Sequence, residues 1–128
     1  MESRRYQDGL AVFEKMTGKD GIVILEHIRE LYPDMAHLIV TNAFGDIYTR
    51  PGLDLKQREI VTLSSLITQG AMDQLPVHVS AALNVGLTPK EIVEIVIQCT
   101  VYAGFPKALS ALHIVMDVCK EHSICIEM

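Results

Sequence analysis

Apolar residues recur at three- and four-residue steps along most of this chain, which is the spacing of amphipathic helices. Short breaks rich in Gly, Pro, Asn and Asp interrupt the pattern. They divide the chain into seven predicted helices, at about 3–16, 22–31, 35–48, 55–68, 74–84, 89–103 and 107–121. The run IVIL at 22–25 is also compatible with a strand, but its flanking charges fall on one face only with the helical period. The pattern therefore predicts an all-α fold.

Several predicted helices begin with residues that suit a helix start. Asp34, Asp54 and Asp73 each precede a helix and can accept hydrogen bonds from its free amides. The clearest start is Thr88, which is followed by a proline at the first helical position and by Glu91 three residues on. This arrangement predicts a capping box, in which side chain and backbone of the two residues bond reciprocally. The segment GFP at 104–106 predicts a break before the last helix.

The length of 128 residues and the 49% apolar share predict one domain, 1–128, with a packed core. We expect residues 1–3 and 122–128 to be flexible tails. The connections between helices are short, which favours antiparallel neighbours, and the helix at 55–68 is apolar over much of its girth. Mean hydropathy is positive. A chain this small with so much apolar surface is expected to self-associate.

Composition also argues against several classes of function. The net charge of −5, with no basic patch, argues against nucleic-acid binding. Neither a signal peptide nor an apolar membrane span is evident, so we expect a cytoplasmic protein that does not bind membranes. The cysteines, Cys99, Cys119 and Cys125, cannot all pair within one chain, and none belongs to a Cys-x-x-Cys pair or a histidine cluster. Reduced thiols and no metal site are expected.

Two polar residues stand within apolar helical patterns, Glu59 in the helix at 55–68 and His78 in the helix at 74–84. Successive helices joined by a short break lie side by side, so these two side chains are expected to meet. A carboxylate beside an imidazole orients the ring and its proton, and such a pair can move a proton. Such a pair can equally be structural, with each member satisfying the other in the core. The spacing leaves both interpretations open.

Four further residues are weaker candidates for binding a substrate. Gln74 lies four residues before His78 and shares its helix face. Arg50 and Arg58 carry planar donors that suit an anionic ligand, although Arg50 lies in a predicted turn. Tyr102 lies at a helix end, where it can line a pocket. The other histidines sit among polar neighbours or, for His113, on the last helix, and we interpret them as structural or surface residues.

The chain resembles the carboxymuconolactone decarboxylase family in several segments that match in order. These are NAFGDIYTRPGL at 42–53, the Arg58-Glu59 start of an apolar helix, His78 with the Ala-rich stretch to Gly86, and YAGFP at 102–106. The resemblance extends from about residue 4 to residue 118. It implies an all-helical fold of the alkylhydroperoxidase D-like group, with a central antiparallel helix pair, assembled as homotrimers or as homohexamers built from smaller units.

In the redox branch of that group, a Glu is followed by a Cys-x-x-Cys pair and then by a His. Carried onto this chain, the Glu falls on Glu59 and the His on His78, whereas the cysteine positions fall on Ala71 and Gln74. Thiolate attack on a peroxide requires a thiol, so disulfide-based peroxidase chemistry at that motif is excluded. The proton-handling pair is retained without the thiols.

The resemblance implies a cofactor-free lyase similar to 4-carboxymuconolactone decarboxylases, acting on a small carboxylated lactone or a related acid. In that interpretation His78 handles the proton, Glu59 orients it, and Gln74, Arg50, Arg58 and Tyr102 contact the substrate. Two alternatives remain open at this stage. One is a peroxide-stress protein of the same fold that uses Cys99, Cys119 or Cys125, and the other is a non-catalytic helical assembly module.

Overall fold

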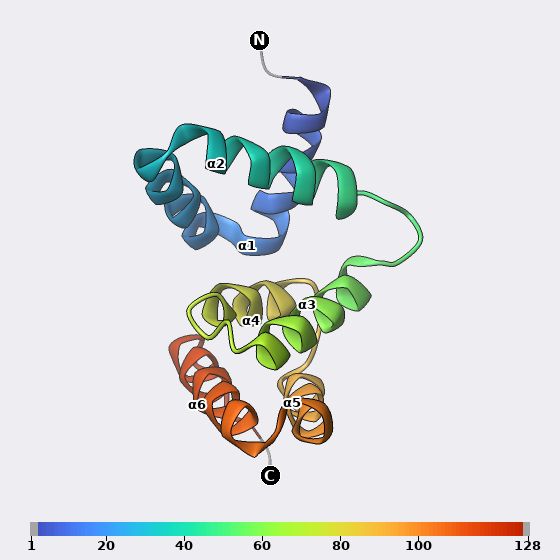
Figure 1. Cartoon of the computed structure of the whole chain (residues 1–128), viewed down its shortest axis with the longest axis vertical. Coiled ribbons are helices and arrows are strands. Elements are labelled where there is room, and N and C mark those ends of the chain that lie inside the picture. The colour runs from blue at the N-terminus through green and yellow to red at the C-terminus, as the bar shows by residue number, and fades with distance from the viewer. Residues whose placement is uncertain (1–2, 127–128) are drawn as a thin grey trace. The chain divides into compact units, whose positions relative to one another are not determined.

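A computed structural model describes residues 3–126 of the chain (Figure 1). Within these residues the structure contains six α-helices and one π-helix, and no strand, which confirms the predicted all-α fold. Backbone contacts divide the chain into two compact units, residues 1–55 and residues 56–128. The prediction that they form one domain stays a prediction. None of the described helices is both long enough and apolar enough to cross a membrane.

The first unit begins with α1 (Arg4–Leu31), a long helix with a sharp kink (Figure 1). The Ser3 side chain caps it by accepting a hydrogen bond from the Tyr6 amide. Two separate helices were predicted here, and α1 indeed consists of two helical segments that meet at a kink. The break falls at Gly18, whose φ of 67° and ψ of −159° are not helical. Glycine adopts positive φ without the Cβ clash that other residues suffer, and the predicted stop at this glycine is confirmed as a break in the helical backbone.

The third predicted helix forms as two elements, α2 (Pro33–Leu38) and the π-helix η1 (Ile39–Ile47). The prediction that Asp34 caps it is wrong, because the helix already starts at Pro33 and Tyr32 is its N-cap without a side-chain hydrogen bond. Proline lacks an amide hydrogen and suits the first turn. In η1 the wider i→i+5 bonding continues to its end, where the Tyr48 amide donates to Ala43 O at 2.9 Å.

The first unit is held together where α1 crosses η1. Gly9 and Gly45 let the two backbones approach closely, since a Cβ added at Gly9 would lie 2.1 Å from Val40 O. Beside this crossing, the Phe13 and Phe44 rings pack edge to face with centroids 4.9 Å apart. An ion pair spans the same two helices. Arg5 Nε donates to Asp46 Oδ1 at 2.8 Å, and this contact holds the pKa of Asp46 below its usual value.

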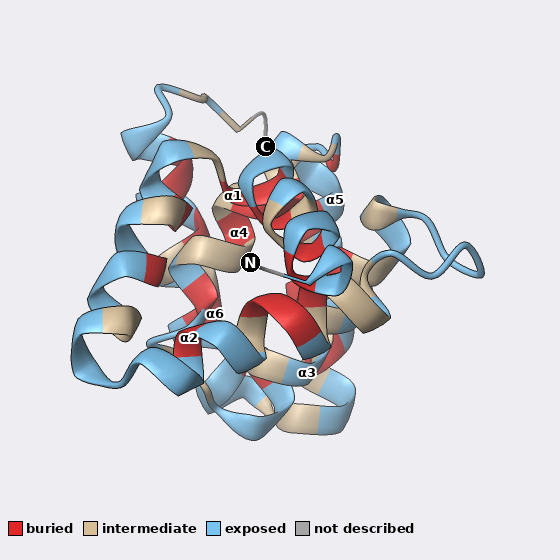
Figure 2. Cartoon of the chain, turned by 90° about the horizontal axis from the view of Figure 1, so that it is seen from above, coloured by how far each residue is buried: buried red, intermediate tan, exposed pale blue. Residues whose placement is uncertain are grey.

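The second unit consists of α3 (Leu55–Gln69), α4 (Leu75–Asn84), α5 (Pro89–Ala103) and α6 (Phe105–Glu121). Buried positions form short stripes along helices whose other positions are exposed or of intermediate burial (Figure 2). The apolar members of these stripes make one core cluster. Its larger residues are Leu63, Ile67, Leu75, Val79, Leu87, Ile92, Val96, Val115 and Val118.

The capping box at the start of α5 is confirmed. Thr88 Oγ1 accepts from the Glu91 amide at 3.1 Å, and Glu91 Oε1 accepts from the Thr88 amide at 2.9 Å. The contacts with Thr88 lower the pKa of the Glu91 carboxyl, and the hydrogen bond from the Thr88 backbone has the largest effect. Two other expected starts are wrong. Gln74, not Asp73, is the N-cap of α4, and α6 begins at Phe105 because a proline in the first turn disrupts no intrahelical bond.

The chain after α6 turns back onto the second unit. The Ile124 amide donates to Cys119 O at 2.8 Å. Ile124 and Ile126 then pack against the core cluster. The prediction that residues 1–3 and 122–128 are flexible tails stays a prediction, and residues 1–2 and 127–128 lie outside the described part of the chain.

Candidate functional site

Glu59 is positioned by α3, in the stripe of that helix that faces the core. It is spaced four residues from Leu63, which is four residues from Ile67, and all three are buried. Residues four apart share one helix face, so the helix that buries the two apolar side chains also buries the carboxylate. The side chain of Glu59 has no exposed surface.

His78 lies on α4 next to the buried Val79 and retains 19% of its side-chain surface. Its Nδ1 lies 3.3 Å from Oε2 of Glu59. The predicted meeting of the two side chains is therefore confirmed. The distance is at the long end of a hydrogen bond, as is common for proton-transfer groups without a bound substrate.

The contact uses one ring nitrogen and one carboxylate oxygen. When Glu59 is ionised, Nδ1 of His78 carries the shared hydrogen and donates it, which leaves Nε2 as the ring atom available to another molecule. The second oxygen of Glu59, Oε1, is buried and has no hydrogen-bond partner among residues 3–126. A buried carboxylate oxygen without a partner is costly, so this arrangement is not optimised for stability.

The other predicted site residues lie on different elements around Glu59 and His78 in the sequence. Gln74 is the exposed N-cap of α4, one turn before His78, and Ala71 precedes it in the turn out of α3. Arg58 adjoins Glu59 on α3 and is half-buried. Arg50 is exposed and belongs to the first unit. Contact of Gln74, Arg58 or Arg50 with a substrate stays a prediction.

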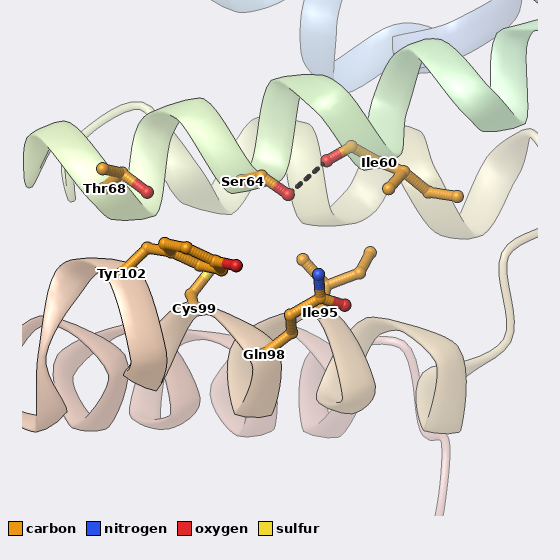
Figure 3. Close-up of a pocket in the computed structure, with 7 residues that line it drawn as sticks. All are labelled: Ile60, Ser64, Thr68, Ile95, Gln98, Cys99 and Tyr102. Atoms are coloured by element: carbon orange, nitrogen blue, oxygen red, sulfur yellow. Dashed lines mark hydrogen bonds between the residues drawn. The ribbon is translucent and has the colours of Figure 1, made fainter.

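Tyr102 lines a cleft of about 250 Å³ between α3 and α5 (Figure 3). From α3 the cleft is lined by Ile60, Ser64 and Thr68. From α5 it is lined by Ile95, Gln98, Cys99 and Tyr102. Glu59 and His78 are not among its lining residues. Apart from Tyr102, sequence reasoning missed this site, although its two walls repeat at three- and four-residue steps on two helices.

The thiols differ in their surroundings. Cys99 and Cys119 are buried and Cys125 is exposed. Burial raises the pKa of the Cys119 thiol, which disfavours its thiolate. Within residues 3–126, no group of three or more His, Cys, Asp or Glu side chains is arranged to hold a metal ion.

Sequence comparison identifies relatives of this chain. The sequence model of the carboxymuconolactone decarboxylase family matches residues 33–117. A 4-carboxymuconolactone decarboxylase from Acinetobacter baylyi is 32% identical over 127 residues, which cover 98% of this chain and 95% of the relative. A nitrosuccinic acid decarboxylase from Metarhizium robertsii is 33% identical over 113 residues, which cover 88% and 79%. The chain belongs to the carboxymuconolactone decarboxylase family.

Proposed function

We propose that this protein is a cofactor-free decarboxylase that acts on a small carboxylated lactone or a related acid, with Glu59 and His78 handling the proton. The observation that carries the proposal is the 3.3 Å contact between His78 Nδ1 and the fully buried Glu59. It is supported by two relatives named as decarboxylases, which act on different acids.

Decarboxylation breaks the bond between the carboxylate carbon and its neighbour, and carbon dioxide leaves without the bonding electron pair. That pair needs an acceptor, and an unsaturated lactone or another electron-withdrawing group in conjugation can take it. The resulting carbanion equivalent then gains one proton on carbon. The net change is the loss of carbon dioxide and the gain of one hydrogen on carbon, and the protein must deliver that hydrogen as a proton.

His78 is the group that delivers the proton in this scheme. In its doubly protonated form the ring donates from Nε2 to the substrate carbon, while Nδ1 keeps its hydrogen bond to Glu59. The negative charge of Glu59 stabilises the imidazolium before transfer and fixes the ring orientation. His78 is then reprotonated from solvent through its exposed edge. Glu59 acts through His78 and is a positioning residue.

The binding of the substrate carboxylate or lactone oxygens is assigned in this proposal to Arg58 and Gln74, whereas a role for Arg50, which belongs to the first unit, stays a prediction from the sequence. Guanidinium groups bind carboxylates through paired donors, and an amide supplies one donor for a lactone carbonyl. Tyr102, the remaining candidate from the sequence, lines the cleft between α3 and α5, which neither Glu59 nor His78 lines, so the proposed reaction assigns it no contact with the substrate.

Replacing the histidine tests the proposal. His78→Gln keeps a polar side chain but cannot carry a proton, and we expect turnover of 4-carboxymuconolactone to fall at least about 100-fold, the lower range for loss of a general acid. Carbon dioxide release and loss of substrate absorbance measure it. In deuterated water the parent protein should place one deuterium on a carbon of the conjugated system that takes up the electron pair.

His113→Gln is the matched control, because His113 is an exposed histidine on α6 outside the pair. It should retain the activity of the parent protein. Unchanged turnover in His78→Gln would refute the mechanism, even if the protein proved to be a decarboxylase.

We also propose that the protein self-associates as a homotrimer or homohexamer. Large apolar side chains between the end of α1 and the end of α2 support this, since they are exposed to solvent in the single chain. These are Leu31, Tyr32, Met35 and Leu38, which are 84%, 64%, 54% and 48% exposed. Exposed apolar groups that gather in one segment are typical of subunit interfaces.

A further inference from the structure

The cleft between α3 and α5 is distinct from the Glu59–His78 pair, although both use α3. Ile60, Ser64 and Thr68 repeat at four-residue steps and form one ridge of that helix. Glu59 lies on the adjacent ridge, because each residue advances about 100° around an α-helix with 3.6 residues per turn. Neither Glu59 nor His78 lines the cleft. A molecule bound there would therefore not occupy the position beside the pair.

The size of the cleft limits what it can hold. Its volume of about 250 Å³ exceeds that of engineered cavities of about 150 Å³ that bind benzene, and lies below the range of about 300–1,000 Å³ found for drug-sized ligands. A single six-membered ring with one small substituent fits these limits.

The walls of the cleft set the charge of its ligand. In Figure 3, Ile60 faces Ile95 at one end, and Thr68 lies opposite Tyr102 at the other. None of the lining residues is an Asp, Glu, Lys, Arg or His. The ammonium of Lys107 is not part of the lining and already donates to Thr68 O at 3.0 Å, so an ionised ligand would lose part of its hydration without an opposite charge in the walls, which is unfavourable. The cleft is therefore suited to an uncharged molecule, in contrast to the anionic acids of the proposed reaction.

One hydroxyl in the cleft has a defined hydrogen-bonding role. Ser64 Oγ donates its hydrogen to Ile60 O at 2.8 Å, within its own helix (Figure 3). Its lone pairs therefore remain, and Ser64 can serve a ligand as an acceptor but not at the same time as a donor. A ligand that complements it must bring an O–H or N–H group. Nearby, the Tyr102 ring offers a flat face on which another ring can stack.

We propose that the cleft between α3 and α5 is a binding site for a small uncharged aromatic alcohol, which donates its hydroxyl hydrogen to Ser64. Phenol is the simplest member of this class. The ring lies among Ile60, Ile95 and Tyr102, and the hydroxyl points toward α3. This site is additional to the proposed decarboxylation and does not depend on it.

Methyl NMR of the full chain, labelled with ¹³C at the isoleucine δ1 methyl groups, tests the proposal directly. Ile60 and Ile95 report from inside the cleft, and Ile114 on α6 reports from elsewhere in the second unit. Phenol is expected to shift the first two signals in a saturable manner and to leave Ile114 unchanged. Anisole, which has no donor, should bind more weakly by roughly fivefold, the value of one ordinary hydrogen bond. Benzoate, which is charged, should cause no saturable shift.

Ser64→Ala removes the acceptor with little risk to folding, because alanine is a strong helix former. It should abolish the preference for phenol over anisole, whereas Ser65→Ala, an exposed neighbour outside the cleft, should preserve it. His78→Gln should bind phenol as the parent does, whatever its turnover. The proposal is overturned if phenol leaves Ile60 and Ile95 unshifted, if benzoate shifts them equally, or if Ser64→Ala keeps the preference for phenol.

Discussion

Packing alone is a poor explanation for the burial of Glu59. It occupies a position of the α3 stripe that a leucine would fill at lower cost, and only one of its oxygens has a partner among the described residues. Replacing buried ionic groups by apolar residues is often neutral or stabilising. Perturbed or costly titratable groups gather at functional sites, so the burial of Glu59 beside His78 favours a chemical role.

The cysteines provide a separate test at the scale of single residues. Burial raises the pKa of Cys119, so this thiol should react slowly with iodoacetamide at pH 8, whereas the exposed Cys125 should react fast. Mass spectrometry of the modified peptides measures both rates. Slow alkylation of Cys125 together with fast alkylation of Cys119 would contradict the structure.

The same shift gives a pH dependence with a definite sign. A thiol whose pKa is higher in the folded than in the unfolded state contributes stability below the unfolded pKa and loses it as the pH rises toward the folded pKa. The free energy of unfolding should therefore fall as the pH rises above about 8.5, the ordinary thiol pKa. In Cys119→Ala the part of this fall that comes from Cys119 should be absent.

Among the elements, the crossing of α1 and η1 depends on two glycines. An added Cβ would lie 2.1 Å from Val40 O at Gly9, and 2.4 Å from Arg5 O at Gly45. Backbone oxygens cannot move aside as flexible side-chain ends can. The close approach of these two helices therefore requires glycine at both positions.

Gly9→Ala tests this crossing. We expect the free energy of unfolding to fall by about 2–3 kcal/mol, the usual cost of overpacking, as measured by urea denaturation. Gly52→Ala is the matched control, because an added Cβ there meets nothing within 4 Å and its φ is not positive. It should change stability by less than about 0.5 kcal/mol. Equal stability of the two variants would show that the helices do not cross as described.

The elements also show how far the sequence predicts the fold. Apolar spacing identified the helices and the stripe that buries Glu59, and local chemistry identified the capping box at Thr88. The sequence did not predict the π-helix η1. Its i→i+5 bonding occurs where Gly45 contacts α1, and that contact joins residues that are far apart in sequence. Pro106 was interpreted as part of a break, although it lies in the first turn of α6, whereas Pro89 was correctly placed at the start of its helix.

One part of the candidate site could be predicted from the sequence, and another part could not. The contact between Glu59 and His78 followed from two successive helices with a short connection, so the sequence could predict it. The cleft combines residues 60–68 with residues 95–102, and the distance between those helices depends on how the whole core packs. No local pattern carries that information.

For the whole molecule, self-association is the property that the apolar surface predicts. Met35→Lys places a charge among the exposed apolar residues at the start of α2 and should shift the protein to smaller species, as measured by size-exclusion chromatography with light scattering. Asp20→Lys, at an exposed polar position of α1, should leave the parent assembly intact. A parent protein that runs as a monomer at all concentrations would refute the proposed trimer or hexamer.

The central claim is that Glu59 is retained for proton handling at a cost in stability, and Glu59→Gln tests it most directly. The substitution keeps the shape and removes the charge, so turnover of 4-carboxymuconolactone should fall at least about 100-fold. Glutamine keeps an oxygen that can accept from His78 Nδ1 and removes a fully buried charge, so urea denaturation of the same sample should show an unfolding free energy that is unchanged or higher. Retained turnover with a loss of about 1–3 kcal/mol, the cost of an orphaned buried partner, would show instead that the pair is structural.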